Sequence, residues 1–330
     1  MSAWKAFARG VAAVRRNPGL PALLLCANLL LAAVLAVPLS VALERDLRDT
    51  GAAETMLYGF DHDFWSRWSE QHADSFYANF SPEIFGSGFS LRNLELLTRG
   101  HLPLRLFDHG EEGAGKPLDA AILGLGGLYI LLQTFLGGGA LSVLRAPQGG
   151  FRLRALLQAS GFYFGRLFRL MLLGLALYGL VFALNAPFAR WADARAYEAV
   201  SEATALGWVA GRHLLLLAAL LLVFTLLSYA KAVIVLEERR SALLALLTAV
   251  GFCLRHPLKV LAQVALVLAS GFVLLGLWST FDGAFATTGW KTQVVTLVGM
   301  QALMFGRIGL RLALLGGQLA LYRTEQDLTP

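Results

Sequence analysis

The residues best suited to metal chemistry lie in one acidic stretch near position 60. Asp61, His62 and Asp63 are consecutive, and His72 and Asp74 follow close behind. Imidazole and carboxylate groups are ligands of zinc and manganese. The spacing matches no His-Glu-x-x-His pattern, so we expect solvated polar side chains of an interfacial helix. His62, Asp63 and His72 remain the metal candidates, and the sequence predicts no bound metal or other cofactor.

A glycine-rich segment, Gly110-Glu-Glu-Gly-Ala-Gly-Lys-Pro117, comes close to a phosphate-binding loop. In that motif the residue after the lysine is a Ser or Thr that binds magnesium, whereas here it is Pro117. No β-strand pattern precedes the segment, so we interpret it as a turn. The sequence also lacks a Ser-His-Asp arrangement and a nucleophile elbow, which favours a function other than catalysis.

Four polar residues fall inside apolar segments. Asn28 and Gln133 are expected to form hydrogen bonds between helices. Arg307 and Arg311 are four residues apart, on one helix face. A charge inside a membrane is a functional hypothesis by default, in competition with snorkelling of the side chain to the interface. Glu237 or Glu238, which follow the fourth span, could pair with these arginines.

The elements that carry these residues belong to a membrane protein. The 330 residues are 57% hydrophobic and 15% charged, and the mean hydropathy is +0.61. Soluble domains are about 45–50% apolar and about 25% charged, so a soluble globular chain is excluded, and so is a disordered one. The net charge is +6, and the basic residues lie in short segments beside the apolar ones, as is typical of membrane proteins. Nucleic-acid binding is therefore not expected. Cys26 and Cys253 form no disulfide framework and are predicted to be small buried hydrophobes.

Six segments are long enough to cross a bilayer, which takes about 20 apolar residues. The first apolar segment is too long for a cleaved signal peptide and is predicted to be a retained signal anchor. Gly137, Gly138 and Gly139 interrupt the second segment, and close helix packing is favoured there over a broken, transporter-like helix. The predicted spans are 18–43, 118–144, 167–187, 213–236, 257–281 and 294–315.

The charge distribution predicts that both termini lie in the cytoplasm. The N-terminal segment and the segments after the second and fourth spans are rich in Lys and Arg, whereas 44–117 is acidic. Trp191, Trp208, Trp278 and Trp290 fall at the predicted outer ends, where indole rings anchor helices. The expected location is the bacterial inner (cytoplasmic) membrane.

An internal repeat organises the spans. Segment 155–166 matches segment 245–256 in register at Ala, Leu, Leu, Ala, Gly and Phe, and Arg16-Asn17-Pro18 matches Arg255-His256-Pro257. Each copy precedes a span on the cytoplasmic side, so we predict an interfacial amphipathic "elbow" helix before each pair of spans. The predicted fold is an all-α integral membrane protein of three parallel helix-hairpin units: 1–146, 147–236 and 237–330.

The segment 44–117 is predicted to be a periplasmic helical cap. About 70 residues without disulfides make only a marginal core, which argues against an independent enzyme domain. A second apolar run, from Leu91 to Leu102, predicts another short helix in the cap. The aromatic residues of the first cap helix recur at near-helical spacing: Phe60, Phe64, Trp65, Trp68, Phe76 and Phe80.

The first elbow is the clearest amphipathic helix. Trp4, Phe7, Val11 and Val14 form one stripe, and basic residues form another, so this helix is expected to lie in the headgroup region. The alternative is an elbow that only positions the next span. The residues predicted to bind lipid or a partner are basic or aromatic and lie at the membrane interfaces: Arg9, Arg16, Arg166, Arg255, Arg307, Arg311, Trp65 and Trp68.

The stretch from Ser228 to Leu243, continuing to Arg255-His256-Pro257, resembles a class of bacterial inner-membrane proteins of unassigned function. These proteins share repeated units of an amphipathic helix, Arg-x-Pro and a span. The membrane domain of some glycerophosphodiester phosphodiesterases is similar in style, but their catalytic domain is absent here, so no activity is implied. Segments 81–86 and 93–94 of the cap also resemble that class.

These features predict a non-enzymatic accessory or scaffold protein that binds membrane lipids or a partner membrane complex. The alternative is a transporter or permease subunit for a lipid or small solute, working with another membrane protein or an ATPase subunit. An enzyme acting on lipid through Asp61, His62 and Asp63 is the third hypothesis.

Overall fold

The computed structural model describes residues 1–48, 50–56, 61–72, 75, 120–145, 150–284 and 290–326. Over these residues the regular structure is entirely helical. Backbone contacts divide the chain into two units. One unit consists of Met1–Phe64, Tyr129–Leu170 and Leu226–Pro330, and the other consists of Trp65–Leu128 and Met171–Thr225.

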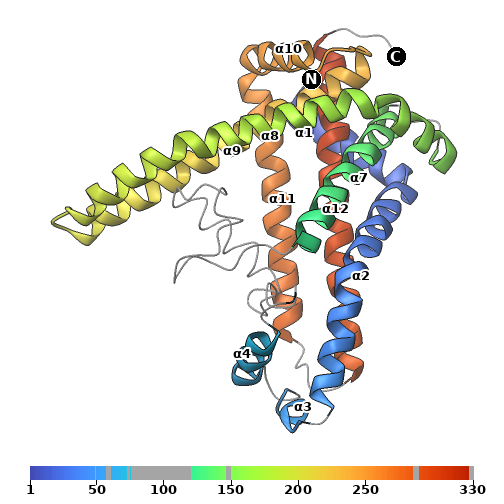
Figure 1. Cartoon of the computed structure of the whole chain (residues 1–330). Helices are drawn as coiled ribbons and strands as arrows, with labels where there is room; N and C mark the ends of the chain where they lie inside the picture. Colours follow the sequence, from blue (N-terminus) through green and yellow to red (C-terminus); the bar gives the residue numbers. More distant parts are fainter. Residues whose placement is uncertain are drawn as a thin grey trace. The chain divides into compact units, whose positions relative to one another are not determined.

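Six helices of the described chain are long and apolar enough to cross a membrane, which confirms the predicted spans of an all-helical, multi-pass membrane protein. Large apolar side chains on their surfaces, such as Leu30 and Phe272, are exposed and form a surface that suits contact with acyl chains. The six helices are α2 (Gly19–Leu47), α7 (Ala120–Arg145), α8 (Leu153–Tyr197), α9 (Glu202–Leu236), α11 (Pro257–Ala284) and α12 (Trp290–Glu325) (Figure 1). The shorter helices are α1 (Ala3–Arg16), α3 (Ala52–Thr55), α4 (His62–Gln71) and α10 (Ala242–Arg255).

Helices α1 and α10 begin and end in the same way. Each has 14 residues and a serine N-cap, Ser2 or Ser241, whose hydroxyl accepts a hydrogen bond from the backbone N–H three residues on. Each ends at a residue that precedes proline, Asn17 or His256, with φ near −127° and −129°. Proline disfavours the helical conformation in the residue before it, so the chain turns at this point and a new helix begins.

The elbow predicted at 155–166 is not a separate helix. Helix α8 runs without a break through 45 residues, about 68 Å at 1.5 Å per residue, and includes both the elbow and the third span. The corresponding position after Arg166 holds Leu167 in place of a proline, so nothing interrupts the backbone hydrogen bonds. The prediction of three separate elbows was therefore wrong for the second one.

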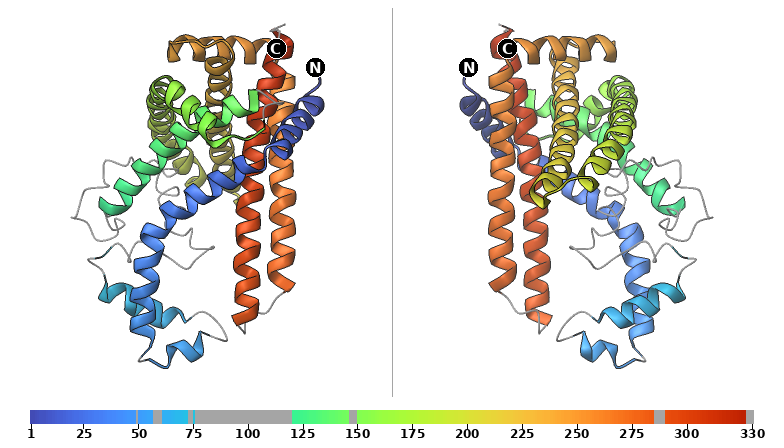
Figure 2. Two further views of the ribbon diagram at one scale, coloured as in Figure 1. Left: turned by 90° about the vertical axis from the view of Figure 1, so that its right-hand side faces the viewer. Right: turned by 90° about the vertical axis from the view of Figure 1, so that its left-hand side faces the viewer.

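Helices α11 and α12 run side by side in opposite directions in the first unit (Figure 2). Helix α1 packs against α12 through small residues, because Ala6, Gly10 and Ala13 are its buried positions. A methyl group on Gly10 would overlap the carbonyl oxygen of Ala313, so the two backbones approach as closely as glycine allows.

Helices α2, α7 and α8 meet through one hydrogen bond and two glycines. The Gln133 side chain donates to Asn28 Oδ1 over 2.7 Å, which confirms the predicted interhelical bond. Gly138 and Gly139 lie against Tyr163 and Ser160 of α8, and α7 continues through them. Close packing, rather than a broken helix, therefore explains these glycines.

The bond between Asn28 and Gln133 is expected to contribute little stability. In a double-mutant cycle of Asn28→Ala and Gln133→Ala, we expect a coupling free energy of about 0.6 kcal/mol, as is typical of polar pairs between membrane helices. Unfolding in mixed micelles provides the measurement. A coupling of zero would show that the two amides do not meet in the folded chain.

In the second unit, residues of α8 and α9 form a helical hairpin. Arg212 is buried and pairs with Asp193, and the indole rings of Trp191 and Trp208 meet edge to face at 5.1 Å. Among the other predicted anchors, Trp278 is buried beside Gly299 in the first unit, and the Trp290 side chain lies outside the described residues.

Candidate functional site

The strongest concentration of polar contacts lies where the end of α9, the helix α10, the start of α11 and the end of α12 meet, which we call the junction. Its centre is the buried ring of Phe252, within about 5 Å of the rings of Tyr229, Tyr322 and His256. These aromatic contacts join α9, α10, α12 and the turn that leads into α11, so the charged groups around them are held in fixed positions.

The carboxylates of the junction already accept hydrogen bonds from basic groups. Glu237 accepts hydrogen bonds from the Tyr322 hydroxyl and from Arg239 Nε, the latter over 2.5 Å. Glu325 accepts from Lys259 Nζ over 2.7 Å and from the Met1 amino group over 2.6 Å. Because both carboxylates already bind basic groups, neither is free to act as a general base.

Glu238 holds a strained position between two arginines. Its φ of 52° is in the left-handed region, which side chains other than glycine rarely adopt. Arg145 donates to its carboxylate over 3.2 Å and to the Val235 carbonyl over 2.8 Å, and Arg166 donates to the Glu238 carbonyl over 3.0 Å. The guanidinium of Arg166 also stacks 4.7 Å from the Phe162 ring centre. Both arginines therefore fix the turn that follows α9.

Two buried glutamines inside the junction were missed by the sequence analysis. Gln263 accepts a hydrogen bond from the Tyr229 hydroxyl over 2.8 Å, while its Nε2 has no partner. Gln318 is fully buried, and neither of its amide atoms has a partner. Buried polar atoms of this kind suit bound water. A polar residue inside an apolar helix is the signal that singled out Asn28, and it applies to both glutamines.

Three of the predicted binding residues lie on the surface near the junction. Arg9 and Arg16 of α1 and Arg255 of α10 are exposed, and none has an acidic partner in the described part of the chain. Arg9 and Arg16 are two helical turns apart and share a face. Arg166, in contrast, is engaged by Glu238.

The predicted pairing of Arg307 and Arg311 with Glu237-Glu238 was wrong. Those carboxylates bind Arg239 and Arg145, and both α12 arginines are exposed. Arg307 lies 4.0 Å from the Met304 sulfur.

The predicted metal candidates of α4 are not brought together as a ligand set. His72 Nδ1 lies 2.9 Å from the Trp68 carbonyl, and its ring stacks 4.5 Å from the buried indole of Trp68. Trp65 packs on the same indole at 5.3 Å. His62 and Asp63 are exposed at the start of the helix. No group of three metal-binding side chains occurs within the residues that the structure describes.

Several segments of the predicted cap lie outside the described residues. They are the glycine-rich segment 110–117, the second apolar run 91–102, the aromatic positions 60, 76 and 80, Asp74, and the segments 81–86 and 93–94.

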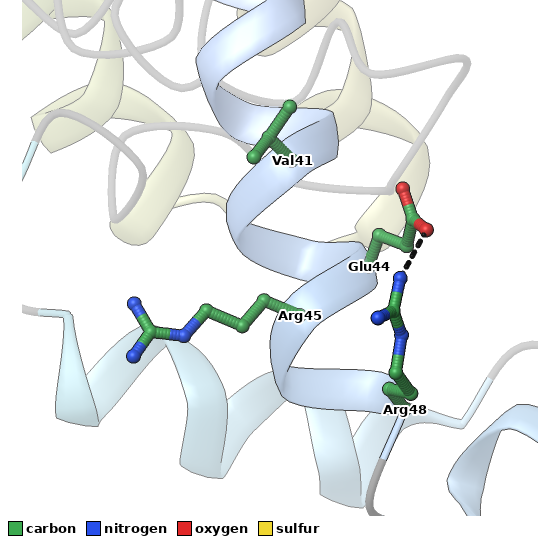
Figure 3. A pocket seen from close by; sticks show the side chains of 4 residues that line it. All are labelled: Val41, Glu44, Arg45 and Arg48. Atoms are coloured by element: carbon green, nitrogen blue, oxygen red, sulfur yellow. Dashed lines mark hydrogen bonds and ion pairs between the residues drawn. The ribbon is translucent and has the colours of Figure 1, made fainter.

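A pocket near the C-terminal end of α2 brings no distant elements together. Val41, Glu44 and Arg45 of α2 line it, together with Arg48, the C-cap residue of the same helix (Figure 3). Glu44 and Arg48 form an exposed ion pair of 2.9 Å, and Arg45 points to the other side of the helix. The pocket is thus a feature of one helix surface.

The cysteines offer no reactive thiolate at the junction. Burial raises the pKa of the Cys253 thiol on α10 to about 11, so the thiol stays protonated at neutral pH. Cys26 is exposed on α2 and is not bonded to Cys253. The prediction that both cysteines are buried was wrong for Cys26.

The chain was compared with protein-family models, curated proteins and solved structures, and none of them matches it. The geometry of the junction is therefore the basis for inferring function. Its carboxylates are bound to basic groups, whereas Arg255 of α10 and Arg9 and Arg16 of α1 have no acidic partner among the described residues. Such an arrangement suits binding of anions better than proton transfer.

Proposed function

We propose that this chain is a non-enzymatic accessory or scaffold protein of the bacterial inner membrane that binds anionic phospholipid headgroups at the junction and at α1. Both termini lie on the cytoplasmic side, and α1 and α10 are the interfacial elbows of the predicted repeats 1–146 and 237–330. The predicted repeat 147–236 carries its elbow as the first turns of α8. One observation carries the proposal. Arg9, Arg16 and Arg255 have no acidic partner among the described residues, whereas the carboxylates of the junction already bind other basic groups.

Helix α1 has the arrangement of an interfacial helix. Its small residues face α12, while Trp4 is 64% exposed and its neighbours on the apolar stripe are half-buried. Arg9 and Arg16 lie on a separate, exposed face. A helix held in this way by the protein can place its apolar stripe among acyl chains and its arginines at the phosphates.

The structural likeness of α1 and α10 supports the relation between the predicted repeats 1–146 and 237–330. They share the serine cap, the length and the turn before proline. The transporter alternative gains no comparable support, because α7 continues unbroken through Gly137, Gly138 and Gly139, and the last two pack against α8.

The proposal predicts that Arg9→Gln combined with Arg16→Gln weakens the preference for anionic lipid. Near a membrane surface each arginine contributes about 1 kcal/mol, so the lipids that touch α1 lose roughly fivefold of their preference per arginine. The measurement is the ratio of phosphatidylglycerol to phosphatidylcholine retained by protein purified from nanodiscs of equal composition.

The matched control removes two arginines at the far end of α2. Arg45→Gln with Arg48→Gln changes the net charge equally and is expected to leave the lipid ratio unchanged. Raising the salt to about 1 M, where the Debye length is about 3 Å, should lower the wild-type ratio. Equal losses in the two double variants, or no enrichment in the wild type, would contradict the proposal.

A further inference from the structure

Two arginines from different helices of the first unit converge on the C-terminal end of α9. Arg145, the last residue of α7, donates a hydrogen bond to the Val235 carbonyl over 2.8 Å. Arg166 of α8 donates to the Glu238 carbonyl over 3.0 Å. Both bonds end on the same short stretch of backbone, which lies with the two arginines in one unit. The two guanidinium groups are therefore held close to each other.

Main-chain carbonyls fix these guanidinium groups without neutralising their charge. A guanidinium has five N–H donors, and each of these carbonyls uses only one of them. Within the described chain, the carboxylate that pairs with the two arginines is that of Glu238, 3.2 Å from Arg145 and with 57% of its side chain exposed. The neighbouring Glu237 is bound to Arg239. Two positive charges thus share one exposed carboxylate, which leaves one positive charge in excess.

The position of the two arginines suits a lipid headgroup. Arg145 ends one spanning helix, and Glu238 follows the end of another by two residues. Basic groups between the ends of spanning helices are a common way to bind anionic headgroups. The ring of Phe162 is 57% exposed, and its centre lies 4.7 Å from Arg166 Cζ. An exposed ring beside the guanidinium offers an apolar surface to the rest of the lipid.

We propose that Arg145 and Arg166 bind one phosphate group, that of an anionic phospholipid headgroup, in place of the Glu238 carboxylate. This inference rests on the proposed lipid-binding function and gives it a stoichiometric site with an internal competitor. A guanidinium offers two parallel N–H groups to two phosphate oxygens, and anchoring on the backbone holds it ready to bind. An exposed ion pair contributes little to stability, so a phosphate can displace the carboxylate.

The test counts the lipids that stay bound to the full chain in a maltoside detergent. Native mass spectrometry follows added phosphatidylglycerol or phosphatidylcholine, and we expect the wild type to hold one phosphatidylglycerol that phosphatidylcholine does not replace. Arg145→Gln or Arg166→Gln should weaken that binding at least about tenfold, because each removes charge-assisted hydrogen bonds to the phosphate. The matched control, Arg154→Gln, removes an exposed charge about three turns before Arg166 on α8 and should keep the lipid.

Removal of the competing carboxylate should have the opposite effect. Glu238→Gln keeps the backbone carbonyl that holds Arg166 and removes the charge that pairs with Arg145. Phosphatidylglycerol should therefore bind up to about fivefold more tightly. A variant that has lost its fold cannot show such a gain, so this result separates binding from a structural role of the turn. Weaker binding after Glu238→Gln would overturn the inference.

Inorganic phosphate distinguishes a soluble anion from a lipid headgroup. Only the wild type, Arg154→Gln and Glu238→Gln should unfold at a higher temperature with phosphatidylglycerol, because they alone keep the site. If inorganic phosphate stabilises them equally, the arginine pair is supported as a phosphate site and the lipid is overturned as its source. Equal binding of phosphatidylglycerol and phosphatidylcholine to every variant, or equal losses after Arg154→Gln and Arg166→Gln, would overturn the site itself.

Failure of this inference can be told apart from failure of the proposed function. Arg9→Gln with Arg16→Gln should keep the one tight lipid and lose the general preference for anionic lipid, whereas Arg166→Gln should do the reverse. A wild type without a tight lipid, but with a preference that depends on Arg9 and Arg16, would contradict this inference alone.

Discussion

Replacing Gly10 with alanine is expected to lower the stability of the folded chain by about 1–3 kcal/mol or more, the usual cost of overpacking. The added methyl group would overlap the Ala313 carbonyl oxygen and lie 2.7 Å from the Gly317 nitrogen. Both are backbone atoms of α12, which cannot rotate away as a side chain can. The two helices must therefore separate, and α1 loses part of its buried contact.

The control for Gly10→Ala is Gly309→Ala on α12. Gly309 has open space around its Cβ position, so the change brings only the better helix propensity of alanine, about 1 kcal/mol. The measurement is the temperature at which half of the detergent-solubilised protein leaves the monodisperse peak. If Gly10→Ala resists heat as well as Gly309→Ala, the close approach of α1 to α12 is wrong.

The sequence was sufficient to predict features that depend on a single segment. Span positions follow from local apolar length, so all six were found. The turns after α1 and α10 follow from one Asn-Pro and one His-Pro step, which act on the adjacent residue alone. The prediction of a separate second elbow was wrong for the same local reason. Segment 155–166 resembles 245–256, but Leu167 stands where Pro257 follows the other copy, so the helix continues.

Side-chain pairing could not be predicted in the same way. Arg307 and Arg311 were assigned to Glu237-Glu238 because all of them lie near the same end of their helices. Which helix faces meet is decided by packing between helices, here by contacts such as Gly10 with Ala313. In the folded chain Glu238 binds Arg145 and Glu237 binds Arg239, whereas Arg307 lies beside Met304.

The hydrogen bond between Asn28 and Gln133 was easier to predict, because two amides in otherwise apolar helices have few alternative partners. Gln263 and Gln318 show the limit of that rule. Both are buried amides in spans, but Gln263 bonds to a tyrosine, and both amide atoms of Gln318 lack a partner. Residue type therefore identifies a polar position, whereas its partner depends on the packing.

Replacing Phe252 with alanine is expected to destabilise the chain by about 3–5 kcal/mol, the range for a buried aromatic side chain. The ring is 2% exposed and contacts Tyr229 of α9, Tyr322 of α12 and His256 at the end of α10, so its loss leaves a cavity bordered by two other helices. The matched control is Leu254→Ala on the same helix, where the side chain is 76% exposed and the expected loss is small.

The same pair of variants separates packing from helix propensity. Both substitutions introduce alanine into α10, so both gain helix propensity, and only Phe252→Ala removes buried contacts. Phe252→Leu should recover part of the loss, because it refills most of the cavity. If Phe252→Ala and Leu254→Ala unfold at the same temperature, α10 is not docked on the junction. The engaged carboxylates would then lose the framework that holds them, since Tyr322 reaches both Phe252 and Glu237.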